Sequence, residues 1–329
     1  MERLDNLFNK VKLSQISTGF KSLDKILNGG FSKGLYVIGA MPAIGKTSLA
    51  LQITSNIAEA GKDVLFFSLL QPAEELFAKI LSRFTYENNK DFALNAKEIL
   101  YNKLDDNEFK KIEQKINREE ALKKIKNIKN KIKIFTNEIS INDISEEIEK
   151  HIKTTGNIPF VIIDYIQVIA PFDYEITDKQ IMDLNIMGLK NISAHFNLTV
   201  LGLSSINRAS YEKDISMESF KESGSIENIV DVLIGLQCST ERKVIKDTAR
   251  GQVLESDSEY KARIEKQAHN DGFIPLELKI LKNRYGITGK FDIFFKPPYS
   301  YFTEDENETI KLGTVIPTPK KRGRKSKNK

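Results

Sequence analysis

The sequence has a single cysteine, Cys238, and its three histidines are scattered at positions 151, 195 and 269. One cysteine excludes an internal disulfide, and the histidines lack metal-ligand spacing. No apolar run approaches the roughly 18 to 20 residues that span a bilayer, and the charged N-terminus lacks the apolar stretch of a signal peptide. We therefore expect a cytoplasmic protein of a reducing compartment, with no membrane partner.

Positive charge is concentrated at the C-terminus. The chain carries a net charge of +5, but its last ten residues, KKRGRKSKNK, contain no acid. Such a block self-repels and attracts polyanions, so 304–329 is predicted to be a disordered basic tail. Arg322 and Arg324 flank a glycine as in minor-groove peptides, but the flanking prolines are missing. Nonspecific binding of these arginines to the DNA backbone is the favoured interpretation.

Apolar runs alternate with helical patterns in the body of the chain. The runs begin at positions 35, 64, 160, 198 and 232, with the sequences LYVIG, VLFFS, FVIID, LTVLGL and VLIGLQ. Continuous apolar strands separated by helices predict an α/β fold with a mostly parallel sheet covered by helices on both faces. Two further runs, LELKIL at 276 and FDIFF at 291, flank a glycine-containing turn and predict an antiparallel hairpin at the sheet edge.

Other segments look like additions to this core. The charged segments 86–150 and 239–271 have mostly helical patterns and are predicted to be surface helices. Residues 1–15 carry an apolar stripe at Leu4, Leu7, Phe8 and Val11, which is typical of an amphipathic linker helix. A helix this short needs a partner, and both the chain's own core and a neighbouring subunit remain open.

A phosphate-binding loop follows the first strand. The order strand, AMPAIGKTS, helix is the one that such loops require. Backbone N–H groups at a helix N-terminus would surround the phosphates of ATP, Lys46 would reach the outer phosphates, and Thr47 would bind Mg²⁺. Alanine replaces the usual first glycine. The candidate nucleotide-binding residues are Ala40, Pro42, Ala43, Ile44, Gly45, Lys46, Thr47 and Ser48.

Asp164 ends the apolar run at 160. Open α/β sheets place their ligands at the carboxyl ends of the strands, so we expect this carboxylate to hold Mg²⁺ through water. An aspartate that merely caps a helix is the alternative.

Together these blocks resemble the DnaB-like replicative helicases, whose motor domain has a RecA-like core. The resemblance covers about residues 16–303 and rests on several long blocks in the family's order: STGFKSLD, GAMPAIGKTS, FFSLLQP, IDYIQVI, LSSINR, FKESGSIE and KNR. It implies a ring of subunits, usually six, with ATP between neighbours and single-stranded DNA in the channel. Other replication proteins would be partners.

The resemblance also assigns residues. Lys46, Thr47 and Asp164 match the nucleotide and magnesium positions. Lys282 and Arg284 match a catalytic element that reaches the γ-phosphate of the adjacent subunit, where a cation stabilises the transferring phosphoryl group. The channel loop FKESGSIE implies DNA-backbone contacts from Lys221, Glu222 and Gly224.

Two positions depart from the family. Its members have a glutamate where this chain has Leu70, and leucine cannot act as the base that orients the attacking water. They have a glutamine that senses the γ-phosphate where this chain has Ser205. Replacement of the base by Glu74 or Glu75 requires a displacement of about one helical turn.

Three functions follow from these residues. The first is an ATP-dependent, helicase-like motor that moves on single-stranded DNA in replication or maintenance of a chromosome, plasmid or phage genome. The second, favoured by Leu70 and Ser205, is an accessory or scaffold protein that binds ATP without hydrolysing it. A RecA-type recombination mediator is the third, and IDYIQVI with KESGSIE favours the helicase branch over it.

Overall fold

The computed structural model describes residues 15–171, 176–211, 213–220, 226–239, 244–248, 251–254, 272–304 and 311–312. The predicted N-terminal helix, except for residue 15, lies outside this range. So do the predicted DNA-contact residues Lys221, Glu222, Gly224, Arg322 and Arg324.

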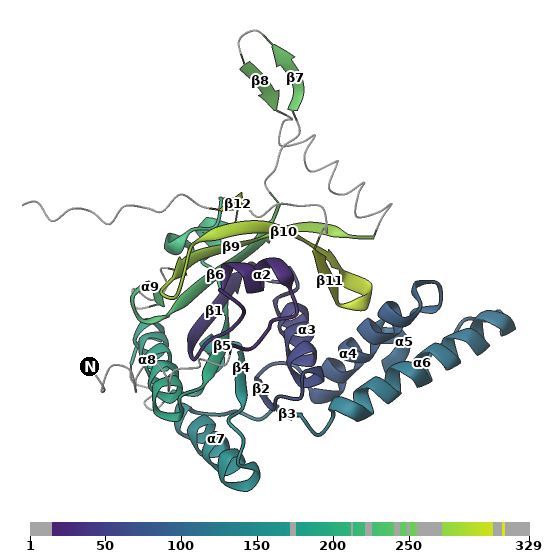
Figure 1. Ribbon diagram of the computed structural model, residues 1–329, viewed down its shortest axis with the longest axis horizontal. Coiled ribbons are helices and arrows are strands. Elements are labelled where there is room, and N and C mark those ends of the chain that lie inside the picture. Colours follow the sequence, from purple (N-terminus) through teal and green to yellow (C-terminus); the bar gives the residue numbers. More distant parts are fainter. Residues whose placement is uncertain are drawn as a thin grey trace, which may run out of the picture.

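A ten-stranded sheet runs through the molecule in the order β11-β10-β9-β6-β1-β5-β4-β2-β3, with β12 paired to β10 (Figure 1). Neighbouring strands from β6 to β3 are parallel, whereas β9, β10, β11 and β12 pair antiparallel. The strands of this sheet are β1 (Gly34–Ala40), β2 (Val64–Ser68), β3 (Ile132–Phe135), β4 (Phe160–Asp164), β5 (Thr199–Ser205), β6 (Val232–Cys238), β9 (Ile274–Asn283), β10 (Gly289–Lys296), β11 (Tyr301–Glu304) and β12 (Lys311–Leu312). The predicted α/β fold with an antiparallel edge is confirmed.

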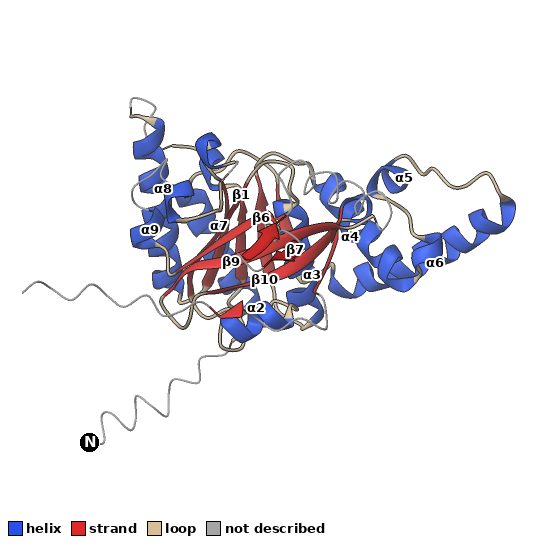
Figure 2. Ribbon diagram, turned by 90° about the horizontal axis from the view of Figure 1, so that it is seen from above, coloured by secondary structure: helices blue, strands red, loops and turns tan. Residues whose placement is uncertain are grey.

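Helices cover both faces of the sheet (Figures 1 and 2). The α-helices are α2 (Lys21–Ile26), α3 (Lys46–Glu59), α4 (Ala73–Asn88), α5 (Ala96–Leu100), α6 (Glu108–Ile128), α7 (Ile141–Thr155), α8 (Asp178–Phe196) and α9 (Ile226–Ile229). Short 3₁₀ turns lie at Lys90–Phe92, Ile166–Val168, Arg208–Ser210, Met217–Phe220 and Pro297–Tyr299. Within the described residues, no helix has both the length and the apolarity to cross a membrane.

The core has two halves because successive strand residues point to opposite faces. Ile38 and Ile162 pack with α2, α3 and α4 in one apolar cluster. Val37 and Ile163 pack with α7 and α8 in the other. The central strands are buried on both faces, which explains why they read as continuous apolar runs.

The segment 86–150 is mostly helical, as predicted, but other details predicted for the peripheral segments were wrong. The segment 86–150 contains helices α5, α6 and α7, but it also contributes β3 to the sheet edge. In 239–271, the residues described beyond Ser239 form the antiparallel strands β7 (Val244–Thr248) and β8 (Gly251–Leu254), where a helix was expected. Glu304, assigned to the tail, ends β11, and residues 311–312 of the same segment pair with β10.

Candidate nucleotide site

The loop between β1 and α3 has the backbone shape of a phosphate cradle. Ala43 (φ 64°) and Gly45 (φ 99°) are in the left-handed region. A side chain at Gly45 would also meet the Phe295 ring at 2.8 Å, so packing as well as backbone requires glycine there. Alternation of such residues turns successive N–H groups to one side, where an anion can bind.

The first turn of α3 supplies further donors. The first bond of the helix ladder at this end joins Leu49 N to Gly45 O at 2.9 Å. The N–H groups of Lys46, Thr47 and Ser48 precede it and have no partner within the helix. The Ser48 side chain is buried, as is Ile44, whereas Pro42 is exposed. The three N–H groups without a partner in the helix are therefore available to a phosphate.

The Lys46 side chain folds back across this loop. Its Nζ donates to the carbonyl oxygens of Ala40 at 2.8 Å and Met41 at 2.9 Å. Burial lowers the pKa of Lys46 to about 8, while the nearby Asp164 carboxylate acts to raise it. The ammonium thus lies over the cradle, where phosphate oxygens would replace the two carbonyls as its partners.

Thr47 and Asp164 meet although they lie far apart in the sequence. Thr47 Oγ1 donates to Asp164 Oδ2 at 2.8 Å. Burial raises the pKa of Asp164, and the hydrogen bond from Thr47 and the charges of Lys79 and Lys46 oppose this shift. Mg²⁺ takes hard oxygen ligands, commonly one or two from protein with phosphate and water completing the shell. A hydroxyl and a carboxylate beside a phosphate cradle fit a magnesium nucleotide.

Leu70 lies on the turn between β2 and α4, beside this pair. Leu69 N donates to the carbonyl of Asp164 at 2.8 Å, and Ser68 Oγ donates to Gln71 O at 2.8 Å, so the turn is fixed at the edge of the site. The Leu70 side chain is 62% exposed. It therefore fills no space in the core, and a longer polar side chain fits at this position.

The substitutes considered for a base lie one turn further on. Glu74 and Glu75 are in the first turn of α4, and both are exposed. The same helix carries Lys79, whose Nζ donates to Gln71 Oε1 at 2.8 Å. Burial lowers the pKa of Lys79, and the charges of Asp164 and Glu75 act to raise it. The pKa of Asp164, in turn, responds to the charge of Lys79 on this helix.

Ser205 ends β5 beside Ala40 of β1, so it lies at the carboxyl ends of the strands, as the phosphate loop does. Sequence reasoning missed its neighbour Gln167, whose Nε2 donates to Ser204 Oγ at 2.9 Å and to the Ser205 carbonyl at 3.3 Å. A glutamine amide thus lies beside the end of β5, although it comes from the turn after β4.

Lys282 and Arg284 lie at the amino ends of the parallel strands, whereas the phosphate loop lies at their carboxyl ends. Asn283 is paired with Val232, which in turn is paired with Tyr36 near the start of β1, whereas the phosphate loop follows the end of β1. The four residue-to-residue steps from Tyr36 to Ala40 alone separate the two levels by roughly 13 Å. Within one chain, the structure therefore does not bring these cations to the nucleotide loop.

The comparison that decides the family is a match to the DnaB-like helicase C terminal domain over residues 15–304. The chain belongs to this family. Among curated relatives, the replicative DNA helicase DnaB of Mycoplasma pneumoniae is 28% identical over 300 residues, covering 87% of this chain and 56% of the relative. The DnaB of Helicobacter pylori strain 26695 is 25% identical, covering 89% of this chain and 60% of the relative. The chain thus spans less than two thirds of the length of these relatives.

Solved structures support the fold. A solved ATPase domain superposes with a TM-score of 0.75 at 21% identity, covering 93% of this chain and 98% of that domain. A DnaB-like replicative helicase studied for its interactions with primase gives a TM-score of 0.73 at 21% identity, with 93% and 66% covered. Both likenesses place this DnaB-like domain in the RecA-like fold that the sequence predicted.

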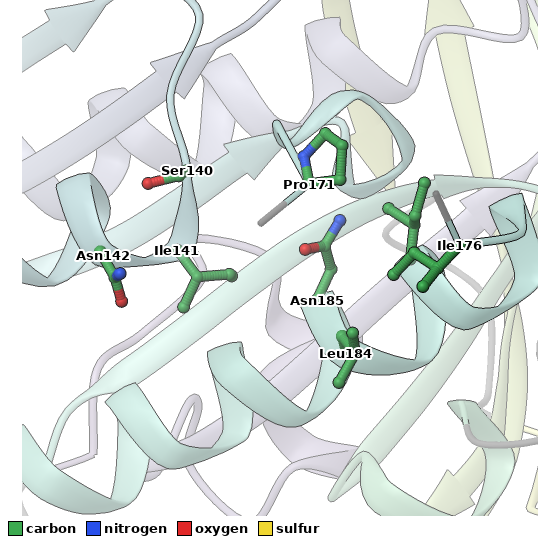
Figure 3. Close-up of a pocket in the computed structure, with 8 residues that line it drawn as sticks. Ser140, Ile141, Asn142, Pro171, Ile176, Leu184 and Asn185 are labelled. Atoms are coloured by element: carbon green, nitrogen blue, oxygen red, sulfur yellow. The ribbon is translucent and has the colours of Figure 1, made fainter. Parts of the chain in front are cut away.

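The DnaB-like domain also has an apolar hollow of about 440 Å³ between the start of α7 and the start of α8 (Figure 3). It is lined by Ile141 of α7, by Leu184 of α8 and by Ile176, which precedes α8. Leu184 is 54% exposed, and Met187, on the same helix, is 51% exposed. These exposed apolar side chains suit an apolar partner.

Proposed function

We propose that this chain is an ATP-driven motor that moves on single-stranded DNA and unwinds duplex DNA during replication in the cytoplasm. The nucleotide site supports binding of ATP, because Lys46, Thr47 and Asp164 converge on a loop shaped for phosphates. Membership of the DnaB-like family supports the coupling of that site to DNA. As the chain covers about half of its relatives, the activity of a whole helicase is part of the proposal.

Assembly into an oligomer is supported by the distance, within one chain, between the phosphate loop and the two cations Lys282 and Arg284. Because Arg284 and Lys282 lie at the amino end of the parallel strands, they reach a phosphate loop only on another subunit. A head-to-tail contact of this kind repeats from subunit to subunit and forms a ring when the rotation closes. We propose a homo-oligomeric ring, a hexamer as in the family, with ATP at each interface.

In this arrangement each residue has a defined task. The α3 N-terminus and Lys46 hold the phosphates, and Thr47 and Asp164 hold the magnesium ion. When bound, that ion neutralises charge on the phosphate oxygens. Arg284 and Lys282 of the next subunit stabilise the charge that develops on the transferring group.

The DNA contacts belong to the same proposal. Gly224 would let the DNA backbone approach the channel loop closely, and Lys221 would supply positive charge. Glu222 belongs to the same loop. Arg322 and Arg324 would add nonspecific charge contacts. These residues are assigned from the family resemblance and the charge pattern alone.

Steady-state ATP hydrolysis by the purified chain, with and without single-stranded DNA, tests the motor. We expect turnover above that of a Lys46→Ala variant and stimulation by DNA, because hydrolysis is coupled to the strand in the channel. A binding assay with a fluorescent ATP analogue runs in parallel. Nucleotide binding without turnover above the blank would reject the motor.

That second outcome identifies the alternative function, a scaffold that uses ATP as an assembly ligand. The exposed Leu70 favours it, since no carboxylate at that position can orient water. Such a protein would form rings in the presence of ATP without consuming it. Size measurement before and after prolonged incubation with ATP distinguishes the two functions.

The ring also gives the N-terminal stripe a place to dock. We propose that Leu4, Leu7, Phe8 and Val11 of one subunit pack on the hollow around Leu184 of the next. Leu184→Asp should then shift the assembly toward monomers in light scattering, because a carboxylate is costly to bury among apolar side chains. Leu100→Asp, at a 42% exposed leucine on α5, is the matched control. An unchanged ring size for Leu184→Asp would contradict this docking.

A further inference from the structure

Asp231 lies at the junction between α9 and β6 and is 2% exposed. Its backbone N–H donates to Leu35 O at 2.9 Å, and its Oδ2 accepts from Leu35 N at 2.8 Å. The two main-chain groups of Leu35, at the start of β1, therefore hold the backbone and the carboxylate of Asp231 at the amino ends of the parallel strands. A buried carboxylate needs such partners, since burial alone penalises its charge.

Two cations share this carboxylate. Lys190 Nζ of α8 donates to Oδ2 at 2.5 Å, and Arg284 Nη1 lies 3.2 Å from Oδ1. Arg284 is bound a second time through its backbone, whose N–H donates to Asp231 O at 3.0 Å. Its Nη2 donates to Asn228 O at 2.7 Å. The guanidinium is thus held at two nitrogens, while 46% of the side chain stays exposed.

Lys282 contacts the same junction in a different manner. Its Nζ donates to the carbonyl oxygens of Glu227 at 2.7 Å, Asn228 at 3.2 Å and Val230 at 2.7 Å. An ammonium group has three donors, so all of them are occupied within the chain. Arg284, whose side chain is 46% exposed, is therefore the cation of this junction with donors left for a further partner. Lys282 must exchange one of these carbonyls for a phosphate oxygen before it can act across an interface.

We infer that Asp231 is a positioning residue that orients Arg284 toward the phosphate bound by the neighbouring subunit. The inference rests on the proposed function, in which Arg284 acts across the subunit interface. A free arginine side chain samples many rotamers, and fixing its base and two nitrogens beforehand reduces the freedom lost when it meets the phosphate. Lys190 is a second partner of the carboxylate and contacts Oδ2, whereas Arg284 contacts Oδ1.

The test removes the carboxylate and Lys190 together, so that Lys190 is not left without its counter-charge. The double variant Asp231→Asn/Lys190→Met should lower the turnover of ATP by about 10- to 100-fold, the effect of misplacing a catalytic group by about 1 Å. Its affinity for a fluorescent ATP analogue should match that of the wild type, because the phosphate loop lies at the other sheet edge. Lys190→Met alone is the matched control and should retain most of the turnover, since Arg284 keeps its carboxylate.

Subunit mixing separates positioning from general damage to the fold. Mixed with Lys46→Ala chains, the double variant should regain turnover, because its intact loop then meets a correctly held Arg284 from the other chain. Damage to the fold of the variant would also impair that loop, and mixing would restore nothing; this result overturns the inference.

Two more variants distinguish the failure of the inference from the failure of the function. If Arg284→Ala hydrolyses ATP like the wild type, the shared-site function fails and the inference with it. If Arg284→Ala is impaired but the double variant is not, only the inference fails. Should the double variant not fold, Arg284→Lys serves instead: it keeps the charge without the fork that binds Asp231 and Asn228. A loss of at least about tenfold is expected, and wild-type turnover would overturn the inference.

Discussion

Replacing Leu70 with glutamate should raise the rate of ATP hydrolysis by about 10²- to 10⁴-fold, the usual contribution of a positioned general base. The turn that carries Leu70 is bonded to Asp164 through Leu69 N, so a carboxylate there lies next to the magnesium position. The side chain is 62% exposed and packs little, so the substitution should leave the fold intact. Single-turnover hydrolysis, which isolates the chemical step from product release, is the measurement.

The matched control is Leu70→Gln, which has nearly the same shape as glutamate but accepts no proton. It should hydrolyse ATP at the wild-type rate. An equal gain from both variants would show that polarity or hydration at this position matters, and the assignment of a missing base would be wrong. Glu75→Gln adds a second check: a large loss in this variant would identify Glu75 as the base that the wild type uses.

The central strands could be predicted because each is buried on both faces and forms an unbroken apolar run. β3 was missed for the opposite reason. It is a four-residue edge strand in which Lys133 is exposed, so its sequence, IKIF, reads like part of the charged segment around it. Short strands at an edge bury too little apolar surface to leave a pattern.

The nucleotide site was predictable to the extent that its parts are contiguous. The loop from Ala40 to Ser48 is one segment, and the rule that ligands bind at the carboxyl ends of parallel strands placed Asp164 near it. The Asp231 cluster gave no such signal. Its partners, Lys190 and Arg284, come from α8 and from the turn after β9, and each is an ordinary charged residue in its own segment. Only the fold brings them together.

Replacing Arg284 with alanine is the second large expected effect. A cation that stabilises the transferring phosphoryl group contributes about 10³- to 10⁵-fold to the rate, so turnover should fall to the level of the Lys46→Ala blank. Affinity for ATP should change little, because the phosphate loop stays intact and Arg284 acts mainly on the charge that develops in the transition state. Turnover and binding are measured on the same preparation.

A mixture of Arg284→Ala and Lys46→Ala chains then tests whether the site is shared. Each variant alone has a defect at every interface of a ring. In mixed rings, some interfaces join the intact phosphate loop of an Arg284→Ala chain to the intact arginine of a Lys46→Ala chain, so hydrolysis should exceed that of either variant alone. Mixed rings that stay inactive would mean that both residues serve the same chain. That result conflicts with their positions at opposite edges of one sheet unless Arg284 leaves Asp231 and the strand that carries it is rearranged.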